Sequence, residues 1–344
     1  MDKRFNDLKW LAVTMLISKC YCRCRHCKGR GCFPSSPYET KVTYPEAERI
    51  LLQLYDWKKD NHLAQMRLTF NQMETWDYEG VTERIRLGKL LYNCYGPVVC
   101  NGMQFRPYAQ LLDYMRCVRA AGVHTAVTTF YGTRDFHDAF AGREGDFDFT
   151  VSVAKAAAEA GLTNMHTLFL AHSTLPYLPE MIEYLSALPG KHGFQFRPIL
   201  SDFEVLTDEA ELLSKNEFAA LPEFIRRKCP YKMKTRAEWN QYLLSSQFHD
   251  ETKDYHNLYM ILRIGSKDFA PYYQLSLDEF ISQAIDKEIA KREATPTMLE
   301  LLERYGNEHI DSPLLYTLWD IQAEWKLKYH QEHHPGPLFY SAYM

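Results

Sequence analysis

Ser18-Lys-Cys-Tyr-Cys-Arg-Cys-Arg-His-Cys27 directly follows an apolar run at residues 11–17. Within this stretch Cys20, Cys24 and Cys27 have the spacing C-x3-C-x2-C. Three thiolates on one tight loop suit three irons of a cubane iron–sulfur cluster. Such clusters are normally held by four thiolates, so a three-cysteine loop predicts one iron that is open to an external ligand.

A zinc site is the alternative reading of the same cysteines. C-x2-C is also a zinc half-site, and Cys22 and Cys32 are candidate further ligands. A zinc knuckle, however, has no need to follow a buried strand at the front of an α/β chain. The loop therefore favours an iron–sulfur cluster over zinc, and zinc stays open as the alternative.

The composition indicates a globular chain of one large domain, or one domain with an extension. The chain has 344 residues, of which 46% are hydrophobic, and a net charge of −4, which gives no general reason to expect nucleic acid as a partner. No apolar stretch approaches the ~20 residues of a membrane span. The N-terminus lacks the apolar core of a signal peptide. Five of the nine cysteines fall between Cys20 and Cys32, which is not a secreted disulfide framework, so we expect a reducing cytoplasm.

Strands and helices are predicted to alternate over the first 200 residues. The predicted strands are 11–17, 65–70, 97–100, 124–130, 165–170 and 194–199, and the predicted helices are 44–57, 79–92, 108–121, 147–160 and 179–188. Strands separated by helices pair in parallel through right-handed crossovers. Ligands of such sheets and barrels bind at the C-terminal ends of the strands, where the cysteine loop is expected.

Helical segments dominate from about residue 201 onward. Ser214 with Glu217, and Ser276 with Glu279, predict capping boxes at two helix starts. Ser312-Pro313 predicts a third start, as N-cap and first helical residue. One strand-like run, 255–264, interrupts the helices. We therefore expect a core at residues 1–200 and a packed, mainly helical extension at residues 201–344.

The cysteine loop and its context resemble the signature of the radical S-adenosylmethionine (SAM) superfamily. The resemblance implies an α/β fold, a partial (β/α)6 radical SAM barrel. It also implies one 4Fe-4S cluster ligated by Cys20, Cys24 and Cys27. The amine and carboxylate of SAM would chelate the open iron, and one-electron reduction would cleave SAM to a 5'-deoxyadenosyl radical.

Three further residues match SAM-binding positions of that superfamily. Glu74, in Leu68-Thr-Phe-Asn-Gln-Met-Glu-Thr75, matches the glutamate of the Gly-Gly-Glu-Pro motif that holds the SAM ammonium, although the glycines and proline are replaced. Thr129, in Thr129-Phe-Tyr-Gly132, stands at the serine of Ser-Leu-Asp-Gly and would contact the SAM ribose or carboxylate. His26 precedes the third cysteine, where relatives place an aromatic ring against adenine.

A second matching region is expected to be structural. His137-Asp138 and Gly145-Asp-Phe-Asp148 resemble the HDxxRG and GSFD motifs of the superfamily. His137 and Asp138 are predicted to have a structural role at the start of a helix, because the catalytic alternative has no further support in this setting.

The resemblance is to the peptide-maturase branch, which is related to SPASM proteins, but the auxiliary-cluster cysteines are absent. After Cys117 the only cysteine is Cys229. This implies abstraction of a hydrogen atom from a peptide or other small natural-product substrate, with flavodoxin or ferredoxin as electron donor. The rival hypothesis is an iron–sulfur or zinc binding protein without radical chemistry.

Cys229 is predicted to be catalytic, because some peptide epimerases of this superfamily use a lone cysteine to return a hydrogen atom to the substrate radical. It lies within Arg226-Arg-Lys-Cys-Pro-Tyr-Lys232, and the three cations before it are expected to lower its pKa if it is partly exposed. The alternative is a small buried apolar residue.

Overall fold

The first strand of the chain is the centre of a three-stranded parallel sheet. In the computed structural model, which describes residues 3–15, 17, 19–27, 42–72, 76–92, 96–201, 207–265 and 267–333, this strand is β1 (Leu8–Met15). It pairs in parallel with β2 (Arg67–Gln72) on one side and with β8 (Leu258–Ile264) on the other. Leu11 and Val13 of β1 are 0% exposed, and burying such side chains stabilises a fold by about 1.5–3 kcal/mol each. The start of the cysteine loop is therefore fixed by a well-packed central strand.

A second parallel sheet contains four strands in sequence order. They are β3 (Val98–Val99), β4 (Thr125–Phe130), β5 (Thr163–Leu170) and β6 (His192–Pro198). Among the described residues no ladder joins β2 to β3, and the two sheets are separate. A backbone hydrogen bond from Trp76 to the Val99 carbonyl (3.3 Å) connects the chain after β2 to β3.

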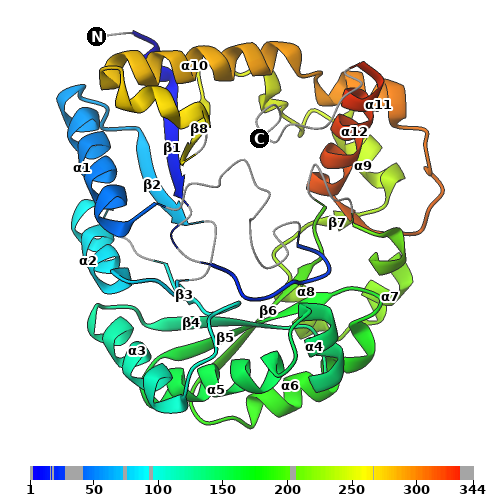
Figure 1. Cartoon of the computed structure of the whole chain (residues 1–344). Helices are drawn as coiled ribbons and strands as arrows, with labels where there is room; N and C mark the ends of the chain where they lie inside the picture. The colour runs from blue at the N-terminus through cyan, green and yellow to red at the C-terminus, as the bar shows by residue number, and fades with distance from the viewer. Residues whose placement is uncertain are drawn as a thin grey trace.

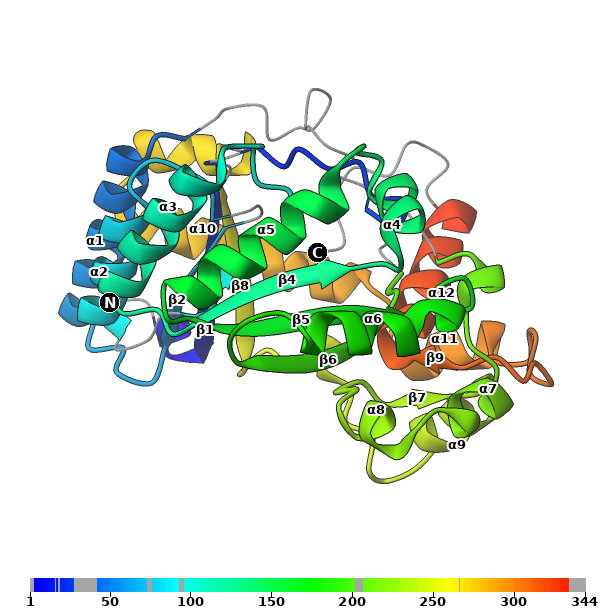
Figure 2. The ribbon, with the colours of Figure 1, turned by 90° about the horizontal axis from the view of Figure 1, so that it is seen from below.

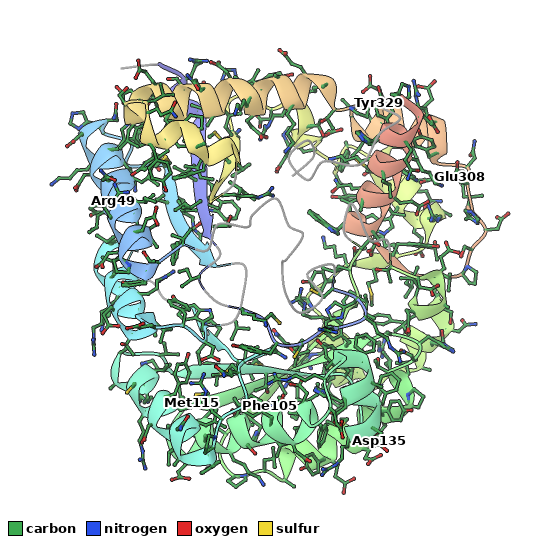
Figure 3. The ribbon with its side chains drawn as sticks, viewed as in Figure 1. Arg49, Phe105, Met115, Asp135, Glu308 and Tyr329 are labelled. Atoms are coloured by element: carbon green, nitrogen blue, oxygen red, sulfur yellow. The ribbon has the colours of Figure 1, made fainter. Side chains whose placement is uncertain are left out.

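Helices connect these parallel strands and cover the outer face of each sheet. They are α1 (Tyr44–Asp60), α2 (Val81–Tyr92), α3 (Tyr108–Ala120), α4 (Arg134–Ala141), α5 (Asp146–Glu159) and α6 (Leu178–Ser186). Figure 1 shows the strands of both sheets on the inside of a ring of helices. Figure 2 shows α5 crossing the face of the second sheet. Met115 of α3 is buried in the apolar cluster between the second sheet and the helices that cover it (Figure 3).

The C-terminal part is mainly helical, as predicted. Its helices are α7 (Lys215–Ala220), α8 (Glu223–Arg227), α9 (Arg236–Leu243), α10 (Leu277–Ala294), α11 (Met298–Tyr305) and α12 (Leu318–His333). Two short strands, β7 (Met233–Lys234) and β9 (Tyr316–Thr317), pair in antiparallel fashion. Short 3-10 helices are Lys3–Asp7, Leu175–Tyr177, Glu209–Glu211, Glu251–Lys253 and Lys267–Tyr273. In the part of the chain that the structure describes, no helix is long and apolar enough to cross a membrane.

The fold is thus α/β with parallel strands arranged as a partial barrel. The predicted capping boxes at Ser214 and Ser276 are confirmed, with both reciprocal hydrogen bonds present in each. The helix start predicted at Ser312-Pro313 is wrong. A reciprocal pair of hydrogen bonds between Thr317 and Asp320 caps α12 instead, so that helix begins at Leu318.

Two other features were not foreseen. Helix α4 forms between β4 and α5, where no separate helix was predicted. The strand-like run in the C-terminal half joins the first sheet as β8, and its apolar residues pack with α10 against the β1 core. The proposed boundary near residue 200 stays a prediction, and hydrogen bonds between β1 and β8 connect the two sides of it.

Candidate SAM and iron–sulfur site

The cysteine loop, residues 19–27, begins beyond β1 and crosses to the second sheet (Figure 1). Three of its backbone amides donate hydrogen bonds to carbonyls beyond β3 and in α4: Tyr21 to Gly102 (2.9 Å), Arg23 to Ala141 (2.6 Å) and Arg25 to Phe140 (3.0 Å). Backbone pairing therefore anchors the loop beyond the C-terminal ends of β3 and β4. This is the edge at which parallel sheets bind ligands.

A glycine permits the close approach of the loop to α4. Gly142 ends that helix with φ 61°, in the left-handed region. A Cβ atom at this position would meet the Cβ and the carbonyl oxygen of Arg23 at 2.9 Å each. Only glycine satisfies both the backbone conformation and this contact without a shift of the loop.

The three predicted ligand cysteines lie on one loop with different exposures. Cys20 and Cys24 are half-buried and Cys27 is exposed. The Cys27 amide donates to the Cys24 carbonyl (3.0 Å), which closes the turn between the last two thiols. Among the described residues no three His, Cys, Asp or Glu side chains gather as ligands of a metal ion. The donor set fits a cluster in its chemistry, because soft thiolates are the ligands of iron–sulfur centres.

The remaining thiol of the loop, Cys22, has a partner outside the loop. Cys22 is 4% exposed, and its Sγ donates to Oδ2 of Asp146 (3.5 Å). The same carboxylate accepts from His137 Nε2 (3.1 Å) and from Arg143 (3.3 Å). Cys22 is thereby part of a buried polar network at the start of α5, and its thiol also interacts with the side chains of Cys20 and Cys24.

His137 and Asp138 build the support beneath the loop. The Nδ1 atom of His137 accepts from the Tyr131 amide (3.2 Å), so its Nε2 carries the proton that it donates to Asp146. Asp138 accepts from the amides of Gly145 (2.6 Å) and Phe147 (2.8 Å), which caps α5. Both residues lie within α4 rather than at its start, and their partners are structural.

His26 is enclosed by aromatic rings. Its ring centroid lies 4.9 Å from that of Phe169 and 5.7 Å from those of Tyr131 and Phe140. Burial, with a smaller effect from the Arg197 charge, lowers the pKa of His26 to about 4, so the imidazole is neutral. Among the described residues its Nδ1 atom is buried without a hydrogen-bond partner.

Tyr131, which the sequence did not identify as a site residue, contacts a candidate ligand directly. Its hydroxyl donates to Cys24 Sγ at 3.2 Å. Burial, and then the negative charge of Cys24, raise the pKa of the phenol well above its usual value, which keeps it protonated. The signal in the sequence is weak, since Tyr131 stands where the Ser-Leu-Asp-Gly motif has aspartate.

Thr129 lies near the C-terminal end of β4 and pairs in register with Thr167. Its neighbours Thr128 and Phe130 are buried on the helix side, so Thr129 faces the opposite side of the sheet. The side-chain Nδ2 of Asn101 donates to the Thr129 carbonyl (3.4 Å), which connects the ends of β3 and β4. Glu74 and Cys32 lie outside the described residues.

Cys229 follows α8 and is half-buried against the apolar cluster on the helix side of the second sheet. Burial raises the pKa of its thiol, so the expected lowering by neighbouring cations is wrong. Those cations, Arg226, Arg227 and Lys228, are exposed, and solvent screens their charge from the thiol. The Phe196 amide donates to the Lys228 carbonyl (3.3 Å), which places the segment beside β6.

Comparison with known proteins gives distant structural similarities. No protein-family model and no curated protein matches the sequence. SuiB of Streptococcus suis, solved bound to S-adenosylmethionine, is 14% identical with a TM-score of 0.41, over 82% of this chain and 64% of that chain. The radical S-adenosylmethionine methyltransferase TsrM of Kitasatospora setae is 12% identical with a TM-score of 0.35, over 56% of this chain and 36% of that chain.

Methylornithine synthase (PylB) is 14% identical with a TM-score of 0.34, over 57% of this chain and 55% of that chain. The chain thus spans less than two thirds of the length of each of these three structures.

Proposed function

We propose that the chain is a radical SAM enzyme that reductively cleaves SAM and abstracts a hydrogen atom from a peptide or natural-product substrate. The observation that carries the proposal is the cysteine loop itself. It presents Cys20, Cys24 and Cys27 at the C-terminal ends of parallel strands, while Asp146 binds the additional thiol of Cys22. Three thiolates and an open iron are what chelation of SAM requires.

Each predicted residue has a separate role in this proposal. Cys20, Cys24 and Cys27 hold one 4Fe-4S cluster, and His26 places its neutral ring against adenine. Glu74 binds the SAM ammonium, and Thr129 binds the ribose or the carboxylate. A cluster held by these three cysteines would supply one electron, received from an external reductant, for the cleavage of SAM into methionine and a 5'-deoxyadenosyl radical. Around the loop, the buried rings of Tyr131 and Phe140 exclude water.

The substrate class and the electron donor come from the family resemblance. A peptide or another natural-product intermediate would be the substrate. Flavodoxin or ferredoxin would reduce the cluster. We place the protein in the cytoplasm, where thiols stay reduced.

The experiment that tests the proposal is incubation of the anaerobically reconstituted protein with SAM and dithionite. A radical SAM enzyme releases 5'-deoxyadenosine, which chromatography with mass detection quantifies. An iron–sulfur or zinc binding protein without radical chemistry, the alternative function, releases none. Protein that binds iron but yields no 5'-deoxyadenosine would therefore favour that alternative.

Glu74 and Thr129 are expected to contribute directly to SAM affinity. Glu74→Ala and Thr129→Ala should each weaken SAM binding by about 1–3 kcal/mol, the usual cost of a lost charged or buried hydrogen bond. Isothermal titration of the reconstituted protein measures this, and iron content should stay unchanged. Thr125→Ala, on the same face of β4 but at its opposite end, is the matched control. Wild-type affinity in both site variants would show that Glu74 and Thr129 are wrongly matched to the SAM-binding positions of the superfamily.

Cys229 is proposed as the donor that returns a hydrogen atom to the substrate radical. The raised pKa keeps it in the S–H form that such a donor needs, whereas its packing on the helix side of the sheet favours the apolar role. Cys229→Ala should still form 5'-deoxyadenosine with a peptide substrate. When this variant turns over in deuterated water, mass spectrometry should find no solvent-derived deuterium in the product. Cys117→Ala, an exposed cysteine on α3, is the control. Full deuterium incorporation by Cys229→Ala would remove this role.

A further inference from the structure

The phenol of Tyr131 lies in contact with Cys24. Tyr131 directly follows β4 and is 6% exposed. Its hydroxyl donates to Cys24 Sγ at 3.2 Å, and its own amide donates to His137 Nδ1 at 3.2 Å. The backbone of Tyr131 is therefore fixed by the buried His137–Asp146 pair while its side chain reaches the sulfur.

Packing on both sides fixes the direction of the hydroxyl. The Tyr131 ring stacks on Phe140, with centroids 4.5 Å apart and an interplanar angle of 26°. It also stacks on Phe169, at 5.4 Å and 22°. Rotation of the ring away from Cys24 would break both stacks. The hydrogen bond to the sulfur is thus pre-organised by the core.

We propose that Tyr131 is a positioning residue that raises the reduction potential of the cluster ligated by Cys24. This inference rests on the proposed function. Reduction adds one electron, supplied by dithionite in vitro, and makes the cluster one charge more negative. A hydrogen bond to a ligand sulfur draws electron density away and so stabilises the reduced form. No covalent bond forms or breaks in this effect.

The surroundings explain why such a donor matters here. The rings of Phe140 and Phe169 make the site around Cys24 apolar, and a low-dielectric environment opposes added negative charge. The Tyr131 hydroxyl opposes that penalty with a dipole directed at the sulfur. The thiol of Cys22 differs from that of Cys24 in its hydrogen bonding, because it donates to a carboxylate and does not accept from a neutral phenol.

The test is a redox titration of the full-length, anaerobically reconstituted chain, followed by electron paramagnetic resonance of the reduced cluster. Tyr131→Phe removes only the hydroxyl and keeps the stacked ring. We expect unchanged iron content, a midpoint potential more negative than that of the wild type, and altered g-values. Tyr177→Phe is the matched control, because Tyr177 packs on Phe136 at 4.7 Å in the same aromatic group. Its midpoint should equal that of the wild type.

A second substitution is expected to shift the midpoint potential in the opposite direction. Genetic incorporation of 3-fluorotyrosine at position 131 makes the phenol a stronger donor, so the midpoint should become more positive than in the wild type. If Tyr131→Phe fails to load iron, the direction of the midpoint shift in the 3-fluorotyrosine protein tests the role of Tyr131 instead. Equal midpoints in the loaded wild-type and Tyr131 variants would overturn the role of Tyr131 and leave the proposed function standing. A wild-type protein that binds no cluster would overturn both.

Discussion

Replacing Cys20, Cys24 or Cys27 by alanine is expected to abolish iron binding. The wild-type chain, reconstituted under anaerobic conditions, should hold about four irons with a broad visible absorption shoulder. Each alanine variant removes one of only three protein ligands, and a cluster held by two thiolates should not survive desalting. Iron analysis and the visible spectrum measure the loss.

The controls are Cys22 and Cys32, the other two cysteines of the segment from Cys20 to Cys32. Cys22→Ala and Cys32→Ala should keep the full iron content. For Cys22 the structure gives the reason, since its thiol is buried and donates to Asp146. A cluster that persists in Cys24→Ala, or eight irons in the wild type, would contradict the assignment of a single three-cysteine cluster.

Removing the carboxylate of Asp146 is expected to cost about 3–5 kcal/mol of unfolding free energy, the typical result of breaking a buried ion pair. The side chains of Asp146 and Arg143 are 6% and 11% exposed. Asp146→Ala would leave the Arg143 guanidinium without its counter-charge and His137 Nε2 without its acceptor. The lower end of the range is expected, because Arg143 keeps its hydrogen bond to the Met103 carbonyl (2.7 Å).

Urea unfolding of the wild type and of Asp146→Ala measures this difference in unfolding free energy. Asp148→Ala is the matched control on the same helix, because Asp148 pairs with Arg134 at the surface and is 52% exposed. A surface pair of this kind typically contributes about 0–1 kcal/mol. If Asp146→Ala were no more destabilising than Asp148→Ala, the buried network would not be what supports the loop.

The sequence was sufficient to predict the elements that local patterns specify. Apolar periodicity placed α3 within a residue of its observed end, and Ser276 with Glu279 predicted the start of α10. The order of strands and helices predicted parallel pairing and put the cysteine loop at the end of β1. These features depend on residues close together in the chain, so no tertiary information was needed.

Pairing between strands far apart in the chain could not be predicted from the sequence. The partner of β1 on its second edge is β8, which lies in the C-terminal half of the chain, and apolar alternation cannot identify a partner strand. The contacts from Tyr131 to Cys24 and from Asp146 to Cys22 likewise join separate segments. Cys229 shows the converse error, since cations adjacent to it in sequence extend into solvent.

In the proposed site, three cysteines leave one iron of the cluster open to SAM. The most direct measurement is the electron paramagnetic resonance spectrum of the dithionite-reduced protein, recorded with and without SAM. If SAM becomes a ligand of the open iron, the g-values should change on its addition, and Cys27→Ala should give no cluster signal in either sample. A reduced cluster whose spectrum is identical with and without saturating SAM would contradict the claim.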